Sequence, residues 1–219
     1  MLIFKTFIFG LILLPCTSFA TVGGPHNVEF LGYDAKDQKV YLLKHYEDGR
    51  GRLPQLYYYQ FKNNKQPEKL IQVNSLYINP KTKKIDYDQD STQFNKDILK
   101  IKKRLTALIA VNKATAKVQI VKKTRVQKSA SSGFDGLITE YQYRYKVVTP
   151  QLSSLQHTAK AYKPHLNISQ AFKIPQHNKM VVAVKYLGIP FETGYSIEDP
   201  VLLTQKNKKL KNKASEEAL

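Results

Sequence analysis

Three short runs of aromatic and β-branched residues near the N-terminus constrain the fold of this chain more than any other feature. They cover residues 28–33, 40–46 and 56–61, and two polar turns separate them. Runs of this length, divided by turns that contain Asp and Gly, are typical of an antiparallel meander. The second turn contains Asp48-Gly49-Arg50-Gly51, which we interpret as a hairpin turn rather than as a ligand loop. Both faces of these strands carry large side chains, so a later part of the chain must cover them.

The clearest helical pattern lies at residues 91–111. Asp90 is positioned to cap its N-terminus, and Gln93 three residues later would complete a capping box. The pattern predicts a long amphipathic helix that packs against the sheet, with a partner-binding face as the alternative. The apolar residues recur at steps of four and three, which places them on one face: Phe94, Ile98, Ile101, Leu105 and Leu108.

A second β-region follows the predicted helix. Alternation at period two over residues 118–127 and 137–148 predicts two strands, each with one buried and one wet face. The apolar run at 180–187 suits a central, well-buried strand, whereas 151–162 is ambiguous between a short helix and a loop. We therefore expect residues 21–205 to form a single α+β domain, mainly antiparallel β-sheet packed against one long amphipathic helix.

The first 20 residues have the pattern of a secretory signal peptide. An apolar core at 6–14 is followed by a breaker and by small residues before a cleavage position after Ala20. This core is too short to span a bilayer, which needs about 20 residues, so we do not expect an integral membrane protein. Cys16 raises a lipoprotein alternative, but Pro15 stands where a lipobox needs a small residue. A mature chain without cysteine favours a bacterial periplasmic or secreted location.

The chain is strongly basic, with a formal net charge of +18. Most of the excess falls on residues 21–205 and not on the lysine-rich segment 206–219, which we expect to be a disordered tail. Such a charge attracts polyanions over a screening length of about 8 Å. Outside the cytoplasm these are phosphorylated lipid headgroups, lipopolysaccharide and cell-wall polymers, so nucleic acid is not an expected partner. The alternative is that the charge only keeps the protein soluble.

Four basic side chains are the candidate contacts for such a partner. If the strands at 118–127 and 137–148 pair, these residues could share one solvent face next to the alternating tyrosines. They are Lys123, Arg125, Arg144 and Lys146.

The sequence contains a pattern that partly matches a calcium-binding loop. Asp86, Asp88 and Asp90 occupy ligand positions 1, 3 and 5, with Asp97 at position 12. However, Ser91 stands where the loop needs glycine, and Asp90 is also required as a helix cap. We therefore favour capping over calcium binding.

No catalytic motif is evident, and we expect no cofactor. The five histidines have no close metal-ligand spacing, and there is no Gly-x-Ser-x-Gly or phosphate-binding glycine loop. A hydrolase would need two dispersed carboxylates that converge in one cleft with different pKa values. The candidates for that alternative are Glu29, Asp48, Glu140 and Glu192.

Two segments carry a resemblance to known proteins. Residues 30–37 read Phe-Leu-Gly-Tyr-Asp-Ala-Lys-Asp before a strand, and residues 48–54 read Asp-Gly-Arg-Gly-Arg-Leu-Pro before a Tyr-rich strand. Together they resemble the opening of a group of uncharacterised, predicted-secreted bacterial proteins with an "IGYSPDG"-like turn and a "DGSGFPY"-like loop. The chain departs from that pattern at Arg50, Arg52 and Leu53. The resemblance implies a secreted β-rich protein and no particular activity.

These observations together favour a non-enzymatic periplasmic or cell-envelope protein that binds an anionic envelope component through a basic surface. A periplasmic hydrolase with dispersed carboxylates and a structural subunit of an envelope complex are the alternatives.

Overall fold

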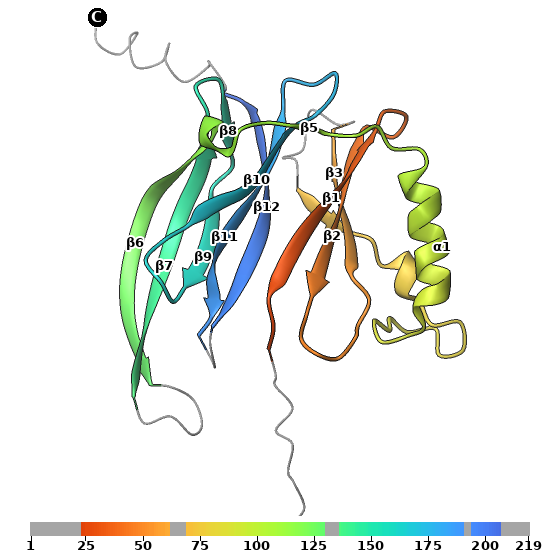
Figure 1. Cartoon of the computed structure of the whole chain (residues 1–219), viewed down its shortest axis with the longest axis horizontal. Helices are drawn as coiled ribbons and strands as arrows, with labels where there is room; N and C mark the ends of the chain where they lie inside the picture. Colours follow the sequence, from red (N-terminus) through yellow and green to blue (C-terminus); the bar gives the residue numbers. More distant parts are fainter. Residues whose placement is uncertain (1–22, 62–68, 130–135, 191–193, 207–219) are drawn as a thin grey trace, which may run out of the picture.

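A computed structural model describes residues 23–61, 69–129, 136–190 and 194–206 (Figure 1). The predicted leader, Glu192 and all but the first residue of the predicted tail lie outside these ranges, and the leader and tail stay predictions.

Strands dominate the described part of the chain, which contains a single α-helix. In chain order the elements are β1 (His26–Asp34), β2 (Lys39–Tyr46), β3 (Gln55–Gln60), β4 (Leu70–Gln72), η1 (Ser75–Tyr77), α1 (Ser91–Lys102), β5 (Ile109–Ala110), η2 (Lys113–Thr115), β6 (Lys117–Ser129), β7 (Leu137–Val148), β8 (Leu152–Ser154), β9 (His157–Ala161), β10 (Asn167–Lys173), β11 (Met180–Ile189) and β12 (Tyr195–Gln205).

The strands are hydrogen-bonded in the order β4-β3-β2-β1-β12-β11-β10-β5, and β8 joins the β6, β7 and β9 group to β12. All pairings are antiparallel except that of β1 with β12, which pair in parallel at His26 and Ile197. The predicted meander is confirmed, because β1, β2 and β3 pair in sequence. Asp48 stabilises the second turn: its side chain accepts a hydrogen bond from the Arg50 backbone N–H and forms an ion pair with Arg52.

The elements pack as successive layers with a hydrophobic core between each pair (Figure 1). The strands β7 and β9 pack on one face of β10, β11 and β12, and β1, β2 and β3 pack on the other. The helix α1 covers the far face of β2 and β3, where Phe94 and Ile98 belong to the same core as Tyr41 and Leu43. The meander is therefore covered on both faces.

The strand β11 occupies the middle of this stack. Its residues Met180, Val182 and Val184 belong to the core with β7 and β9, whereas Val181 and Ala183 belong to the core with β1 and β2. All five are buried. This confirms the prediction of a central buried strand, because only a strand covered on both faces can be apolar at every position.

The predicted long helix is wrong, because α1 ends at Lys102. The chain then turns, and Thr106 forms two backbone hydrogen bonds of 2.8 Å with Tyr33 on β1. Of the predicted apolar stripe, the two residues beyond the helix end are still partly buried, since Leu105 packs with the core under α1 and Leu108 with the core of β1 and β2. The apolar residues that suggested a longer helix therefore lie partly in an extended segment that runs across the sheet.

The predicted N-cap is confirmed, since the Asp90 side chain accepts a hydrogen bond from the Thr92 backbone. The capping box is not formed, because the Gln93 amide donates to Asp97 instead. The ambiguous segment 151–162 contains β8 and β9.

Candidate functional site

A β-bulge in β6 decides which side chains lie on each face of the β6–β7 hairpin. Ile120 pairs with Tyr145, but the next pair is Lys122 with Arg144, so Val121 is an extra residue. Directly opposed residues of two antiparallel strands share a face, and a bulge shifts the alternation by one position. Lys122 therefore lies on the outer face with Arg144, although Ile120 lies on the inner face.

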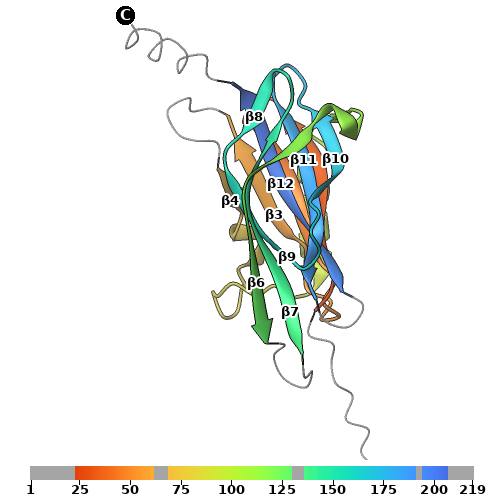
Figure 2. The same cartoon turned by 90° about the vertical axis from the view of Figure 1, so that its left-hand side faces the viewer.

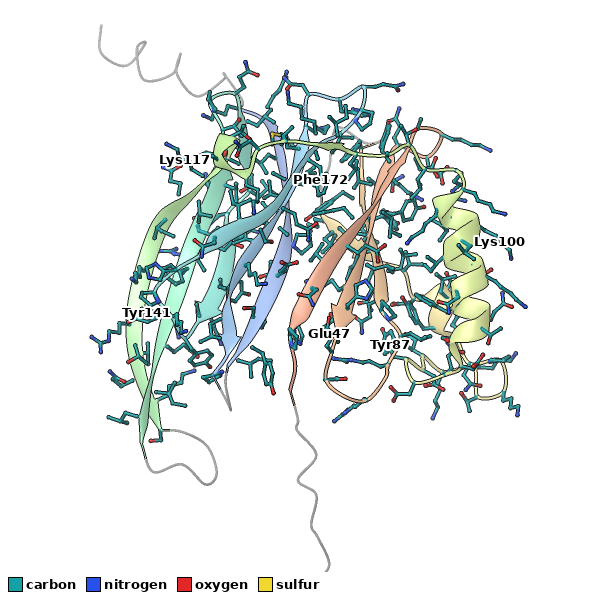
Figure 3. All side chains as sticks on the ribbon, in the orientation of Figure 1. Glu47, Tyr87, Lys100, Lys117, Tyr141 and Phe172 are labelled. Atoms are coloured by element: carbon teal, nitrogen blue, oxygen red, sulfur yellow. The ribbon has the colours of Figure 1, made fainter. Side chains whose placement is uncertain are left out.

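The four basic residues predicted to share one face are divided between two. Arg144 and Lys146 lie on the outer face of β7, whereas Lys123 and Arg125 lie on the same face as the tyrosines of β7. The ammonium of Lys123 lies 4.7 Å from the centre of the Tyr141 ring, and Figure 3 shows Tyr141 on this hairpin. The predicted pairing of the strands is confirmed, but the shared face is wrong because the bulge interrupts the alternation.

The outer face of β6, β7 and β9 instead carries two adjacent cross-strand rows of cations and hydrogen-bond donors. Figure 2 views the molecule from the side of these strands. Neighbouring positions in one row have Cβ atoms about 5 Å apart, and diagonal positions are about 7–8 Å apart. We call these six residues the basic grid: Lys122, Arg144 and Thr158 in the first row, and Thr124, Gln142 and Lys160 in the second.

All six residues of the basic grid line a pocket of about 650 Å³. Five of them are exposed and Gln142 is half-buried. Tyr143 and Tyr186 also line the pocket, and the buried Tyr143 hydroxyl has no hydrogen-bond partner among the described residues. Ligand sites have volumes of about 300–1,000 Å³, so the pocket is large enough for an anionic headgroup or a sugar phosphate.

The cations around this pocket have no counter-ions in the described part of the chain. On β6, β7 and β9 only Lys128 makes an ion pair with a carboxylate. The other seven cations of these strands make none within the described residues. They are Lys117, Lys122, Lys123, Arg125, Arg144, Lys146 and Lys160.

In the layers on the opposite side of the molecule several cations do have carboxylate partners, although Lys81, Lys84 and Lys96 have none within the described residues. There Lys102 pairs with Glu29, Arg104 with Asp34, and Lys100 with Asp97. The sequence explains the asymmetry, because residues 117–160 contain eight lysines and arginines and only Asp135 and Glu140 as acidic residues. The strands that carry the basic grid therefore have a local excess of positive charge.

Glu140 is a buried carboxylate beside the basic grid, with 1% of its surface exposed. It accepts hydrogen bonds from Lys128 at 2.7 Å, Gln142 at 2.8 Å and Tyr162 at 3.2 Å. The bond from Lys128, followed by that from Gln142, holds the pKa of Glu140 below its usual value. Glu140 therefore carries a negative charge that Lys128 compensates, and it orients the Gln142 amide at the edge of the grid.

The other carboxylates considered for catalysis do not share partners. Glu29 on β1 contacts His45 and Lys102, which lower its pKa despite the opposing effect of burial. Asp48 lies in the β2–β3 turn with Arg52. Thus the three described candidates lie on different elements, each with its own cation.

The residues of the calcium-like pattern act locally. Asp86 accepts hydrogen bonds from Asn79 and from the Asp88 backbone, which lower its pKa, and Asp90 caps α1. No group of three potential metal-ligating side chains was found among the described residues.

Sequence reasoning identified Arg144 but missed the other members of the basic grid. Lys122 was assigned to no face, because the bulge at Val121 has no signal in period-two alternation. Lys160 lies in a segment whose secondary structure was ambiguous.

Comparison with protein-family models, with curated proteins and with solved structures found no match. No α-helix in the described ranges has the length and apolar character needed to cross a bilayer.

Proposed function

We propose that this protein is a non-enzymatic cell-envelope protein that binds a phosphate-bearing lipid or polymer through the basic grid. The observation that carries the proposal is the gathering of Lys122, Arg144 and Lys160 in two adjacent rows, where none of them has a counter-ion among the described residues. The predicted leader supports an envelope location.

Phosphate is the chemistry that fits these side chains best. An arginine can donate two parallel hydrogen bonds to a phosphate, and lysines add point charges around it. Thr124 and Thr158 stand next to these cations in the two rows and supply hydroxyl donors. An anion bound here relieves the repulsion between like charges that oppose each other across strands.

Five of the six grid residues are exposed, so the pocket is open to solvent and suits the headgroups of a surface or the phosphates of a polymer better than a small buried substrate. Each lysine or arginine close to an anionic membrane surface contributes about 1 kcal/mol of attraction, which falls off within a Debye length. Three grid cations therefore give about 3 kcal/mol, and Lys146, which has no ion pair within the described residues, adds to the field.

The test is a charge-reversal variant with a matched control. Lys122→Glu, Arg144→Glu and Lys160→Glu are combined in one variant, and Lys81→Glu, Lys84→Glu and Lys96→Glu in the control. The control residues are exposed, have no ion pair among the described residues and lie on or near the α1 layer. Both variants change the net charge equally, so only the location of the charge differs.

Binding is measured by sedimentation with phosphatidylglycerol vesicles, with lipopolysaccharide and with soluble polyphosphate at low and high salt. We expect the grid variant to lose most of the binding and the control to keep most of it. If the grid variant loses binding to vesicles alone, lipid headgroups are the source of the phosphate. If it also loses binding to polyphosphate, the grid is a general phosphate site. Equal losses in both variants would refute the grid as the site and support a general effect of net charge.

A further inference from the structure

A second pocket lies at one end of the stacked sheets, and none of the residues that line it belongs to the basic grid. Its volume is about 1040 Å³. Three connections surround it: the segment from β5 through η2, the turn between β7 and β8, and the turn between β10 and β11. Figure 1 shows these connections together at the upper end of the strands.

The inner wall of this pocket is apolar and continuous with the cores of the protein. Met180 and Leu152 belong to the core between β7 and β11, and Ile174 belongs to the core between β1 and β11. Val111 packs against the first of these cores. Ile109 lines the same pocket with 55% of its surface exposed. Met180, Leu152 and Ile174 are themselves buried, so Ile109 and Val111 expose apolar surface to the pocket directly above the ends of both cores.

The polar groups around the pocket are cationic or neutral, and no acidic side chain lines it in the described part of the chain. Lys117 and Lys173 are exposed and have no ion pair within the described residues. Lys179 also lines the pocket, with its ammonium 5.1 Å from the centre of the Phe61 ring. Figure 3 shows Lys117 at this end of the molecule.

The three connections are held by their own hydrogen bonds, so the pocket does not depend on a ligand for its shape. Val111 donates its backbone N–H to Ala171, which fixes the β5 segment on β10. The Lys206 ammonium donates to the carbonyl groups of Thr149 and Pro150 in the β7–β8 turn. Ile174 donates its backbone N–H to Lys179 across the β10–β11 turn.

We propose that this pocket binds a single-chain anionic amphiphile, with the acyl chain against Ile109 and Val111 above the buried Met180 and Ile174, and the headgroup between Lys117 and Lys173. The apolar wall accounts for the chain, because burial of each CH₂ group contributes about 0.8 kcal/mol. The cationic rim and the lack of lining carboxylates account for a negative headgroup rather than a neutral or positive one. The proposal is independent of the basic grid, since no residue lines both pockets.

The chain provides a specific probe of this pocket, because Met1 and Met180 are its two methionines. Protein labelled with ¹³C at the methionine methyl groups is titrated with palmitate, and the Met180 resonance is assigned with Met180→Leu. We expect the Met180 signal to shift and saturate, and the Met1 signal, where that residue is retained, to stay in place. An unchanged Met180 signal at saturating palmitate would overturn the proposal.

Two variants test the rim and the cavity separately, with displacement of a fluorescent fatty acid as the measurement. Lys117→Glu combined with Lys173→Glu should weaken palmitate binding about tenfold and leave hexadecanol binding nearly unchanged, because exposed ion pairs contribute about 0.2–1 kcal/mol each and reversal adds repulsion. Ala114→Trp, at an exposed position in η2 that lines the pocket, should block both ligands by occupying space. Equal binding of palmitate by the wild type and both variants would refute the site.

The triple variant of the basic grid serves as the control for independence. It should bind palmitate as the wild type does, even where it no longer sediments with vesicles. If it lost palmitate binding while Lys117→Glu with Lys173→Glu did not, the amphiphile would bind at the grid and the inference about this pocket would be wrong.

Discussion

Replacing Lys122 by glutamine should make the protein more stable and a weaker anion binder at the same time. Lys122 and Arg144 oppose each other across β6 and β7, and neither has an ion pair within the described residues. Opposed side chains have Cβ atoms about 5 Å apart. Two unit charges held at that separation in water repel by about 0.8 kcal/mol, which screening at physiological salt lowers to about 0.4 kcal/mol. The charged ends of these two long, exposed side chains can spread further apart than their Cβ atoms, so we expect the free energy of unfolding to rise by at most about 0.5 kcal/mol.

The control is Lys117→Gln, the same substitution on the same strand. Lys117 is exposed and pairs with Val148, so no cation lies opposite it. Urea unfolding measures both variants at 50 mM and 1 M NaCl. With a slope of about 2 kcal/mol/M, Lys122→Gln should raise the midpoint by about 0.2 M at low salt and by almost nothing at 1 M, where the Debye length is about 3 Å.

Lys117→Gln should change the midpoint little at either salt concentration. The reasoning fails if Lys122→Gln is no more stable than Lys117→Gln at low salt, or if its gain persists at 1 M salt. Lys122→Gln could also gain stability and still bind phosphatidylglycerol vesicles as the wild type does. That result would support repulsion between the grid cations and refute the grid as the binding site.

Two further predictions test the environment of the grid and the core beneath it. Glu140→Gln should lower the free energy of unfolding by about 2 kcal/mol at pH 7, because hydrogen bonds to a buried charged group are weakened. The pKa of Glu140 is depressed in the folded protein, so its charge stabilises the fold above the unfolded pKa of about 4.3, and this stabilisation is lost as the pH falls through the folded pKa. The urea midpoints of the wild type and Glu140→Gln should therefore converge in acid. A constant difference between the two midpoints down to pH 2 would contradict this assignment. Tyr145→Phe should leave the protein equally or more stable, because the buried Tyr145 hydroxyl has no partner among the described residues. Tyr59→Phe should cost about 1 kcal/mol, because the Tyr59 hydroxyl donates to the Pro200 carbonyl at 2.9 Å; equal effects of the two substitutions in thermal unfolding would argue against this hydrogen-bond assignment.

The parts of the fold that sequence reasoning predicted correctly depend on local signals. The meander follows from aromatic runs divided by Asp- and Gly-containing turns, and β1, β2 and β3 pair as expected. The central position of β11 follows from its apolar run, which only Lys185 interrupts, since residues 180–184 are buried on both faces. The start of α1 follows from Asp90, whose side chain forms the expected cap.

The end of α1 could not be predicted in the same way. The apolar spacing continues to Leu108, and nothing in residues 103–111 forbids a helix. The chain leaves the helix because Thr106 forms two backbone hydrogen bonds with Tyr33, which is more than 70 positions earlier in the sequence. Gly32 next to Tyr33 has a φ of +144° and lies against the Thr106 carbonyl, so a Cβ at that position would collide with it.

The sequence by itself determined the β-rich character, the start of the helix and the large excess of positive charge, because each depends on residue type and short-range spacing. Only the tertiary structure decided which charges act together. One extra residue at Val121 reverses the faces of β6, and β9 brings Lys160 next to Arg144 from outside the hairpin. The basic grid depends on strand register, which is set by hydrogen bonds between distant segments and is not encoded in the alternation of any one strand.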